Sequence, residues 1–408
     1  MEFLFSLFFL SGFLKSFILF FEIPTFIDFT LLTILLLVFY SLIRFKQVSF
    51  NISKKQVIAF MLLSIFYCWL IFSLEYTISP GYSKEKTLYF SINMIGFLFP
   101  LIVRSFNLKK FIKYCTLTTY ILTMIYLGLF YYYITGFYSK ESFELLKGFY
   151  LMNGLFLGAL ITILFTSKAV IFKNKKQDYI FAFVGFLLLI LLGARGPIII
   201  LVLILISFSL VTFSTKFYQK RIPVSLSMRR GQWIFSFFLL FSTIAILFVY
   251  SPQFSELTKR TFSRLSLITQ GISVSGSNEL DMGSSINTRV EQINLSRNTI
   301  VKSTKNFLIG EGIGSFGMLE TGKDKKSYPH NIILEIWVEL GLVGILLFSL
   351  FLIPLVSDVQ PKTYISLFLI AYLFLNALKS NSFVDLRILF ISLSLFMISS
   401  NELKPKKQ

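Results

Sequence analysis

The sequence predicts an all-α protein that crosses a membrane about twelve times, and three observations support this fold class. The 408 residues are 55% hydrophobic, and the apolar residues occur in runs of about 16 to 22, close to the length that spans a bilayer as a helix. Only 14% of the residues are charged, against about 25% in soluble domains. One long polar segment interrupts the apolar runs. We therefore expect a single membrane domain, residues 1–408, with one large loop outside the bilayer.

The expected helices follow one another with short connections, apart from that loop. The first apolar run begins at Phe3 and lacks both a charged leader and a small-residue cleavage site, so we expect a retained helix and not a signal peptide. The expected spans are residues 3–21, 29–43, 57–74, 88–103, 114–135, 149–166, 179–194, 197–213, 233–250, 338–356, 363–378 and 386–400.

Lysine and arginine predict the orientation of these helices, because short cytoplasmic loops are enriched in both residues. With the N-terminus inside, the inner loops and the C-terminal tail carry 21 Lys and Arg, whereas the short outer loops carry 6. The net charge of +19 is thus explained by topology, with anionic membrane lipids as partners. Nucleic acid is not expected as a partner.

The long loop, residues 251–330, is expected on the outer side of the membrane and is expected to carry the function, as ordered loops on rigid scaffolds often do. It contains a basic amphipathic stretch (256–268), a Gly/Ser-rich piece, an expected helix (286–306) and the glycine-rich "IGEGIGSFG". Those glycines match G-x-G-x-x-G, but no strand precedes them, so nucleotide binding is not expected. We expect a tight, closely packed turn with positive φ angles.

The only histidine of the chain, His330, lies between Pro329 and Asn331 just before an apolar run. It is either a solvated residue near a helix start or a general base, since a neutral imidazole near pH 7 can accept a proton. Asn331, Glu335 and Glu339 repeat every four residues and so share one helix face. That face is expected to meet a cavity or the outer loop. The glutamates either pair with basic residues, which we favour, or act directly in catalysis.

Three cations of the outer side could form an anion pocket beside the histidine. Arg195 lies in a very short turn between two apolar spans, Arg289 lies in the expected loop helix, and Lys86 precedes the fourth span. Arginine binds phosphate through paired donors, although an interfacial, snorkelling arginine is the alternative for Arg195. One histidine and two cysteines are too few for a zinc site, so no metal or cofactor is expected.

A base and several cations on the outer side of the cytoplasmic membrane are suited to one reaction, the transfer of a sugar from a lipid-linked diphosphate. No nucleotide sugar is available there, so the donor must carry its own leaving group. The base would take the proton of the attacking hydroxyl, and the cations would neutralise the charge that grows on the departing diphosphate.

The block "GEGIGSFG…YPHNIILEIWVELGLVGILLF" resembles the signature of the O-antigen polymerase and O-antigen ligase family. The number of spans, the large loop and the Arg-Gly-Pro also match. The resemblance implies a bacterial inner-membrane, metal-independent, inverting glycosyltransferase with a GT-C-like fold and an active site facing the periplasm. It implies that His330 is the essential histidine and that Arg195, Arg289 and, less directly, Lys86 hold the diphosphate of an undecaprenyl diphosphate donor.

The resemblance leaves the acceptor open. A polymerase adds glycan to a lipid-linked repeat unit, whereas a ligase moves it onto lipid A core. We favour the polymerase because polymerases are the more numerous and divergent members, and protein O-glycosylation is a third option. A chain-length regulator and a flippase are expected partners of a polymerase. A transporter of the lipid-linked unit is the non-enzyme alternative, but no internal repeat is evident and the ionisable residues gather at the outer surface.

Overall fold

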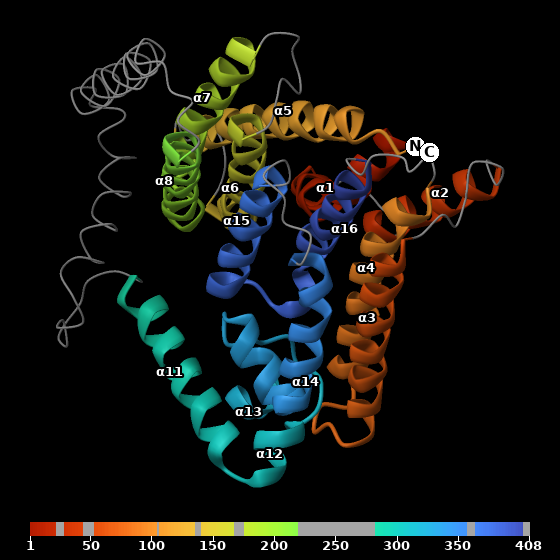
Figure 1. Ribbon diagram of the computed structural model, residues 1–408. Helices are drawn as coiled ribbons and strands as arrows, with labels where there is room; N and C mark the ends of the chain where they lie inside the picture. Colours follow the sequence, from red (N-terminus) through yellow and green to blue (C-terminus); the bar gives the residue numbers. More distant parts are fainter. Residues whose placement is uncertain are drawn as a thin grey trace.

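The computed structural model describes residues 1–21, 28–43, 53–103, 106–134, 140–166, 175–218, 282–356 and 364–402. They form a bundle of α-helices with two short 3₁₀ turns (Figure 1). The elements are α1 (Glu2–Phe20), α2 (Phe29–Ile43), α3 (Lys54–Phe72), η2 (Ser73–Glu75), α4 (Tyr82–Ile102), α5 (Leu108–Ile134), α6 (Lys140–Thr166), α7 (Lys175–Leu191), α8 (Arg195–Tyr218), α11 (Met282–Val301), α12 (Thr304–Ile309), α13 (Phe316–Thr321), α14 (Ile332–Val356), α15 (Tyr364–Ser380), η3 (Phe383–Asp385) and α16 (Arg387–Glu402).

The fold class predicted from the sequence is confirmed. Each expected span within the described residues corresponds to one helix, and the expected loop helix corresponds to α11. The expected span 233–250, and with it residues 251–281 of the long loop, lies outside the described residues. In the part of the chain that the structure describes, four helical segments are long and apolar enough to cross a membrane by length and composition: Lys54–Glu75, Leu108–Tyr132, Phe149–Thr166 and Ile332–Pro354.

Large apolar side chains on the outside of the bundle show where lipid would contact it. Phe39 of α2 is 63% exposed, Ile121 of α5 60% and Leu210 of α8 64%. Such exposure is unfavourable in water and ordinary for a surface that faces acyl chains. The protein is therefore an all-α polytopic membrane protein.

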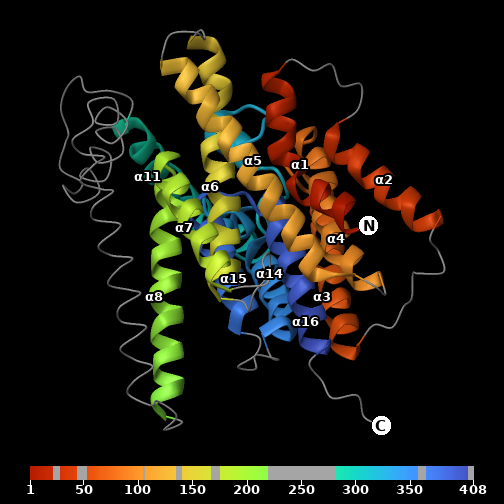
Figure 2. The same ribbon diagram turned by 90° about the horizontal axis from the view of Figure 1, so that it is seen from above.

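Helices α14, α15 and α16 lie in the middle of the bundle in both views (Figures 1 and 2). Helices α3 and α4 pack on one side of them, and α6, α7 and α8 lie on the other (Figure 1). The closest pairings are α14 with α3 and α16 with α4. The central position of α14 means that a residue at its N-terminus is framed by several other helix ends.

Aromatic packing fills the core between these helices. The ring of Phe5 in α1 stacks on Phe99 of α4 at a centroid distance of 5.2 Å, and Phe9 meets Phe156 of α6 edge-on at 5.2 Å. On the other side, Phe66 of α3 lies 5.5 Å from Phe348 of α14. Each such pair contributes about 0.5–1.5 kcal/mol beyond the burial of its area.

The end of the bundle that carries His330, hereafter the histidine end, gathers segments that are far apart in the sequence. The α3–α4 turn, α11 to α13, the N-terminus of α14 and the α15–α16 turn with η3 all meet there (Figure 1). At the opposite end, the backbone N–H of Asn107 donates to Glu2, so the start of α1 lies beside the α4–α5 connection. Glu2 and Asn107, both predicted on the inner side, thus lie together.

Candidate active site at the histidine end

His330 is held in an unusual backbone conformation directly before α14. Its φ angle is 52°, and among the described residues it is the one non-glycine residue with positive φ. Such strain is uncommon outside glycine and gathers at functional sites. The imidazole is partly exposed and meets the ring of Tyr328 edge-on at a centroid distance of 4.6 Å. The structure therefore fixes the direction of this side chain by its backbone and by an aromatic contact.

Asn331 begins α14 and caps it. Its side-chain oxygen accepts hydrogen bonds from the backbone N–H groups of Ile333 at 2.9 Å and Leu334 at 3.2 Å. A side chain that satisfies these otherwise unpaired donors stabilises a helix start by about 1 kcal/mol. Asn331 thus fixes the N-terminus of the helix that follows His330.

Arg289 comes from α11 and lies near the same segment. Burial raises the pKa of Tyr328 to about 12, helped by Asp385 and Glu335, while the positive charges of Arg289 and Lys86 act in the opposite direction. Arg289 therefore lies within electrostatic reach of Tyr328, whose ring contacts His330. The structure thus brings this predicted cation within electrostatic range of the segment that carries the histidine, although some 40 residues separate Arg289 from His330 in the sequence.

Arg195 is the first residue of α8, after a turn in which Gly193 has a φ of 67°. Helix α8 packs on α6 and α15. The ammonium of Lys379, at the end of α15, lies where a Cβ of Gly196 would be. The structure therefore adds a second basic residue beside the Arg-Gly-Pro turn, one that sequence reasoning had counted only as a loop charge.

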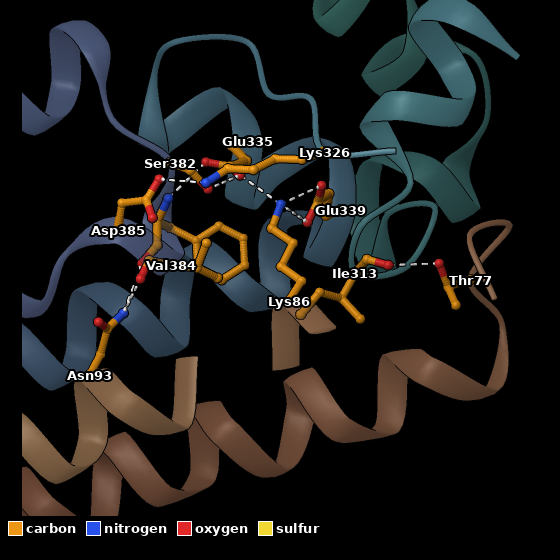
Figure 3. A network of polar contacts seen from close by, with 11 residues as sticks. Thr77, Lys86, Asn93, Ile313, Lys326, Glu335, Glu339, Ser382, Val384 and Asp385 are labelled. Atoms are coloured by element: carbon orange, nitrogen blue, oxygen red, sulfur yellow. Dashed lines mark hydrogen bonds and ion pairs between the residues drawn. The ribbon is translucent and has the colours of Figure 1, made fainter. Parts of the chain in front are cut away.

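Lys86, Glu335 and Glu339 form a buried ionic cluster (Figure 3). The Lys86 Nζ lies 2.6 Å from Glu335 Oε1, and 2.7 Å and 2.8 Å from the two oxygens of Glu339. All three side chains are 0% exposed. The favoured expectation that the glutamates pair with a basic residue is confirmed. The structure also gives the predicted diphosphate ligand Lys86 two protein partners.

The glycine-rich loop is a close-packed junction, as expected. Gly310, Gly312 and Gly314 all have positive φ. A Cβ on Gly312 would collide with the backbone of Thr77, whose hydroxyl donates to the carbonyl of Ile313 at 2.8 Å. The G-x-G-x-x-G pattern therefore serves backbone packing between the long loop and the α3–α4 turn.

Helix α14 is broken at Gly341, which has φ 67° and ψ −169°. Three carbonyls beside the break accept hydrogen bonds from other segments: Val338 from Glu311 N–H at 2.9 Å, Glu339 from Gly312 N–H at 2.9 Å, and Leu340 from the Trp69 indole at 3.1 Å. Irregular backbone is tolerated in a membrane protein where the protein itself satisfies it. The half of α14 nearest His330, residues 332–340, is thus a separate unit.

The segment 322–331, hereafter the strap, leads from α13 to α14 and is fastened at two points. Asp324 accepts hydrogen bonds from the backbone N–H groups of Gly81 at 2.7 Å and Tyr82 at 3.2 Å, and from the Ser79 hydroxyl. Lys326 pairs with Asp385 of η3 at 3.4 Å (Figure 3). These contacts fix the path of the chain into His330.

Sequence reasoning missed Tyr328, Asp324, Lys326, Asp385 and Lys379. The first three lie in "KDKKSYPH", the stretch that ends in the histidine. Lys379, in the last turn of α15, and Asp385, in η3, lie more than 45 residues further along the chain, and no local spacing connects them to the motif. Within the described residues, no group of His, Cys, Asp and Glu is arranged to hold a metal ion.

Comparison with known proteins is consistent with this geometry. The sequence model of the family described as O-antigen ligase matches residues 180–349. The matched region contains Arg195, Arg289, the glycine-rich loop, His330 and the broken part of α14, whereas Lys86 lies outside it. No curated protein matches the chain. Over residues 180–349 the chain is therefore similar to the O-antigen ligase family.

Proposed function

We propose that the protein is a surface-polysaccharide polymerase of the cytoplasmic membrane. It transfers glycan from an undecaprenyl-diphosphate-linked donor to a lipid-linked repeat unit, with inversion at the anomeric carbon and without a metal. The observation that carries the proposal is His330, a partly exposed imidazole with a strained backbone at a helix start, with Arg289 within electrostatic range of Tyr328, whose ring contacts the histidine. The family supports a ligase- or polymerase-type activity.

In the proposed reaction, His330 accepts the proton of the acceptor hydroxyl. The hydroxyl oxygen then forms a bond to the anomeric carbon of the donor sugar, and the bond from that carbon to the diphosphate oxygen breaks. The leaving undecaprenyl diphosphate gains one negative charge. Arg289 and Arg195 neutralise that charge through paired hydrogen bonds. The proton leaves His330 to water on the periplasmic side of the membrane.

A ligase that transfers finished glycan to lipid A core is the second candidate function. The matching family is described as O-antigen ligase, which favours this function. Both reactions use the same donor and need the same base and cations, so the two functions differ only in the acceptor.

The two functions are separated by a gel of surface polysaccharide from a deletion strain of the source bacterium. If the protein is a polymerase, the strain carries core with a single repeat unit. Wild-type protein restores the ladder, whereas His330→Ala and Arg289→Ala do not. Loss of a general base or of a charge-stabilising donor lowers such rates by about 100-fold or more.

Arg297→Ala is the matched control for Arg289→Ala. Arg297 lies two turns further along α11 and is exposed, so this variant should restore the ladder. Bare core together with accumulated lipid-linked polymer in the deletion strain would identify a ligase. A normal ladder with His330→Ala would remove the histidine from the mechanism.

A further inference from the structure

The Lys86 ammonium has used all of its hydrogen-bonding capacity inside the protein. An ammonium has three donors and no acceptor. The three carboxylate oxygens at 2.6, 2.7 and 2.8 Å account for all three donors. The Phe383 ring, 4.7 Å from Nζ, and the Tyr82 ring, 5.9 Å away, lie over the same group. A phosphate oxygen could reach Lys86 only by displacing a carboxylate from a fully buried cluster.

The cluster connects three parts of the histidine end that the chain itself does not hold together. Lys86 is on α4, and both glutamates are on the separated half of α14, residues 332–340. Glu335 also accepts hydrogen bonds from the Ser382 hydroxyl at 2.6 Å and the Phe383 N–H at 2.8 Å (Figure 3). Glu335 thereby attaches the α15–α16 turn to α14. Asp385 of the same turn pairs with Lys326 of the strap.

We propose that Lys86, Glu335 and Glu339 form a positioning lock for His330 and do not bind the donor diphosphate. The lock docks residues 332–340 against α4 and the α15–α16 turn, although the break at Gly341 separates these residues from the rest of α14. His330 lies two residues before this docked unit, so the position of the unit limits where the histidine can lie. This inference rests on the proposed function, because it assigns a role in presenting the proposed base.

The charges of the cluster define a sharp test. One ammonium and two carboxylates give the buried cluster a formal net charge of −1. Lys86→Met leaves two buried carboxylates without their cation, and breaking a buried pair in this way is strongly destabilising. The double variant Lys86→Met/Glu339→Gln restores the net charge of −1. In this double variant, Glu335 still accepts the hydrogen bonds from Ser382 and Phe383.

Thermal unfolding and transfer kinetics of the purified full-length protein then separate a lock from a diphosphate ligand. For a lock, the double variant unfolds at a higher temperature than Lys86→Met. Its KM for the lipid-diphosphate donor stays within about two-fold of wild type, while kcat falls because residues 332–340 are docked less firmly. Arg289→Ala, which removes a proposed diphosphate ligand, provides the comparison and should raise the donor KM.

Two results would overturn the lock. One is a double variant that is no more stable than Lys86→Met. The other is a double variant that is restored in stability but has a donor KM raised ten-fold or more, as expected for a residue that holds the diphosphate. If the wild-type protein transfers no glycan at all, the proposed function fails, and the unfolding temperatures still decide whether the cluster is a lock.

Discussion

At the residue scale, Asp324 fastens the strap to the first turn of α4. Gly81, the residue that precedes this helix, has no side chain to cap it. Asp324 supplies the missing acceptor from more than 240 residues away, through the N–H groups of Gly81 and Tyr82. A negative charge at a helix N-terminus is also favourable. The hydrogen bond from Ser79 lowers the pKa of Asp324, aided by those of Gly81 and Tyr82 and opposed by partial desolvation.

The first prediction at this scale concerns Asp324. The pKa of Asp324 is lower in the folded than in the unfolded protein, so its carboxylate stabilises the fold. This stabilisation is fully present above the unfolded pKa, about 3.9, and is lost as the pH falls through the folded pKa. Asp324→Ala should lower stability by about 1 kcal/mol at pH 7, as loss of a helix cap does. Asp324→Asn keeps one acceptor and should cost less. The measurement is thermal unfolding of the solubilised protein as a function of pH.

The control for both variants is Lys323→Ala, since Lys323 is the exposed neighbour of Asp324 and its removal should change little. The difference in stability between wild type and Asp324→Asn should shrink as the pH falls below 4. A difference that stays constant from pH 7 to pH 3 would show that the Asp324 charge does not contribute.

At the element scale, α14 combines a break with close packing. Gly341 adopts a positive φ of 67°, and a Cβ at this position would collide with the carbonyl of Leu308 and the N–H of Ile309. The break lets residues 332–340 meet α12 and the glycine-rich loop while the remainder of α14 continues into the bundle. The conformation and the contact both require glycine at this position.

Three glycine-to-alanine variants separate these two requirements. Gly341→Ala places a side chain at a positive φ and against the backbone of α12, so it should abolish folding or lower stability by several kcal/mol. Gly322 has a φ of 68° but open space around it, so Gly322→Ala should cost only about 1–2 kcal/mol. Gly128 lies inside α5 with nothing within 4 Å, and Gly128→Ala should be neutral or slightly stabilising.

Yield of folded protein and unfolding temperature are the measurements for this series. The predicted order of stability is Gly128→Ala, then Gly322→Ala, then Gly341→Ala as the least stable. A Gly341→Ala protein as stable as Gly322→Ala would mean that α12 can move away from α14, and that the packing at the break does not define this element.

Much of the element scale could be predicted from the sequence, because apolar runs report helices that contact lipid. The expected span 29–43 coincides with α2, and 363–378 differs little from α15. The errors lie at polar helix ends. Helix α4 begins at Tyr82, before the expected span 88–103, and α14 begins at Ile332, before the expected span 338–356 but where the shared face of Asn331, Glu335 and Glu339 already required a helix. Both helices extend into polar sequence because Lys86 neutralises Glu335 and Glu339 there.

The candidate site was predictable only in part. The uniqueness of His330 and the four-residue spacing of Glu335 and Glu339 are local signals, and they identified these residues and the shared helix face. The partner of the glutamates lies about 250 residues away in the sequence, so no spacing could name it. Tyr328 and Asp385 were missed for the same reason, since their roles arise from contacts between distant segments.

At the scale of the whole molecule, the contacts agree with the topology derived from the charge distribution. The predicted outer segments meet at the histidine end through the hydrogen bonds of Thr77 with Ile313 and of Gly81 with Asp324. Glu2 and Asn107, both predicted inside, meet at the other end. The segment that leads into the proposed base, His330, belongs to the histidine end, and we propose that a lipid-linked diphosphate presents its sugar there.

The central claim is that this face catalyses glycosyl transfer with His330 as base. The most direct test supplies the purified wild-type protein with an undecaprenyl-diphosphate-linked repeat unit, alone or with lipid A core, and measures released undecaprenyl diphosphate and product length. The account predicts products longer than one repeat without added core, a rate at least about 100-fold lower for His330→Ala, and a near-normal rate for Arg297→Ala. Transfer undiminished in His330→Ala, or no transfer to either acceptor by the wild-type protein, would contradict it.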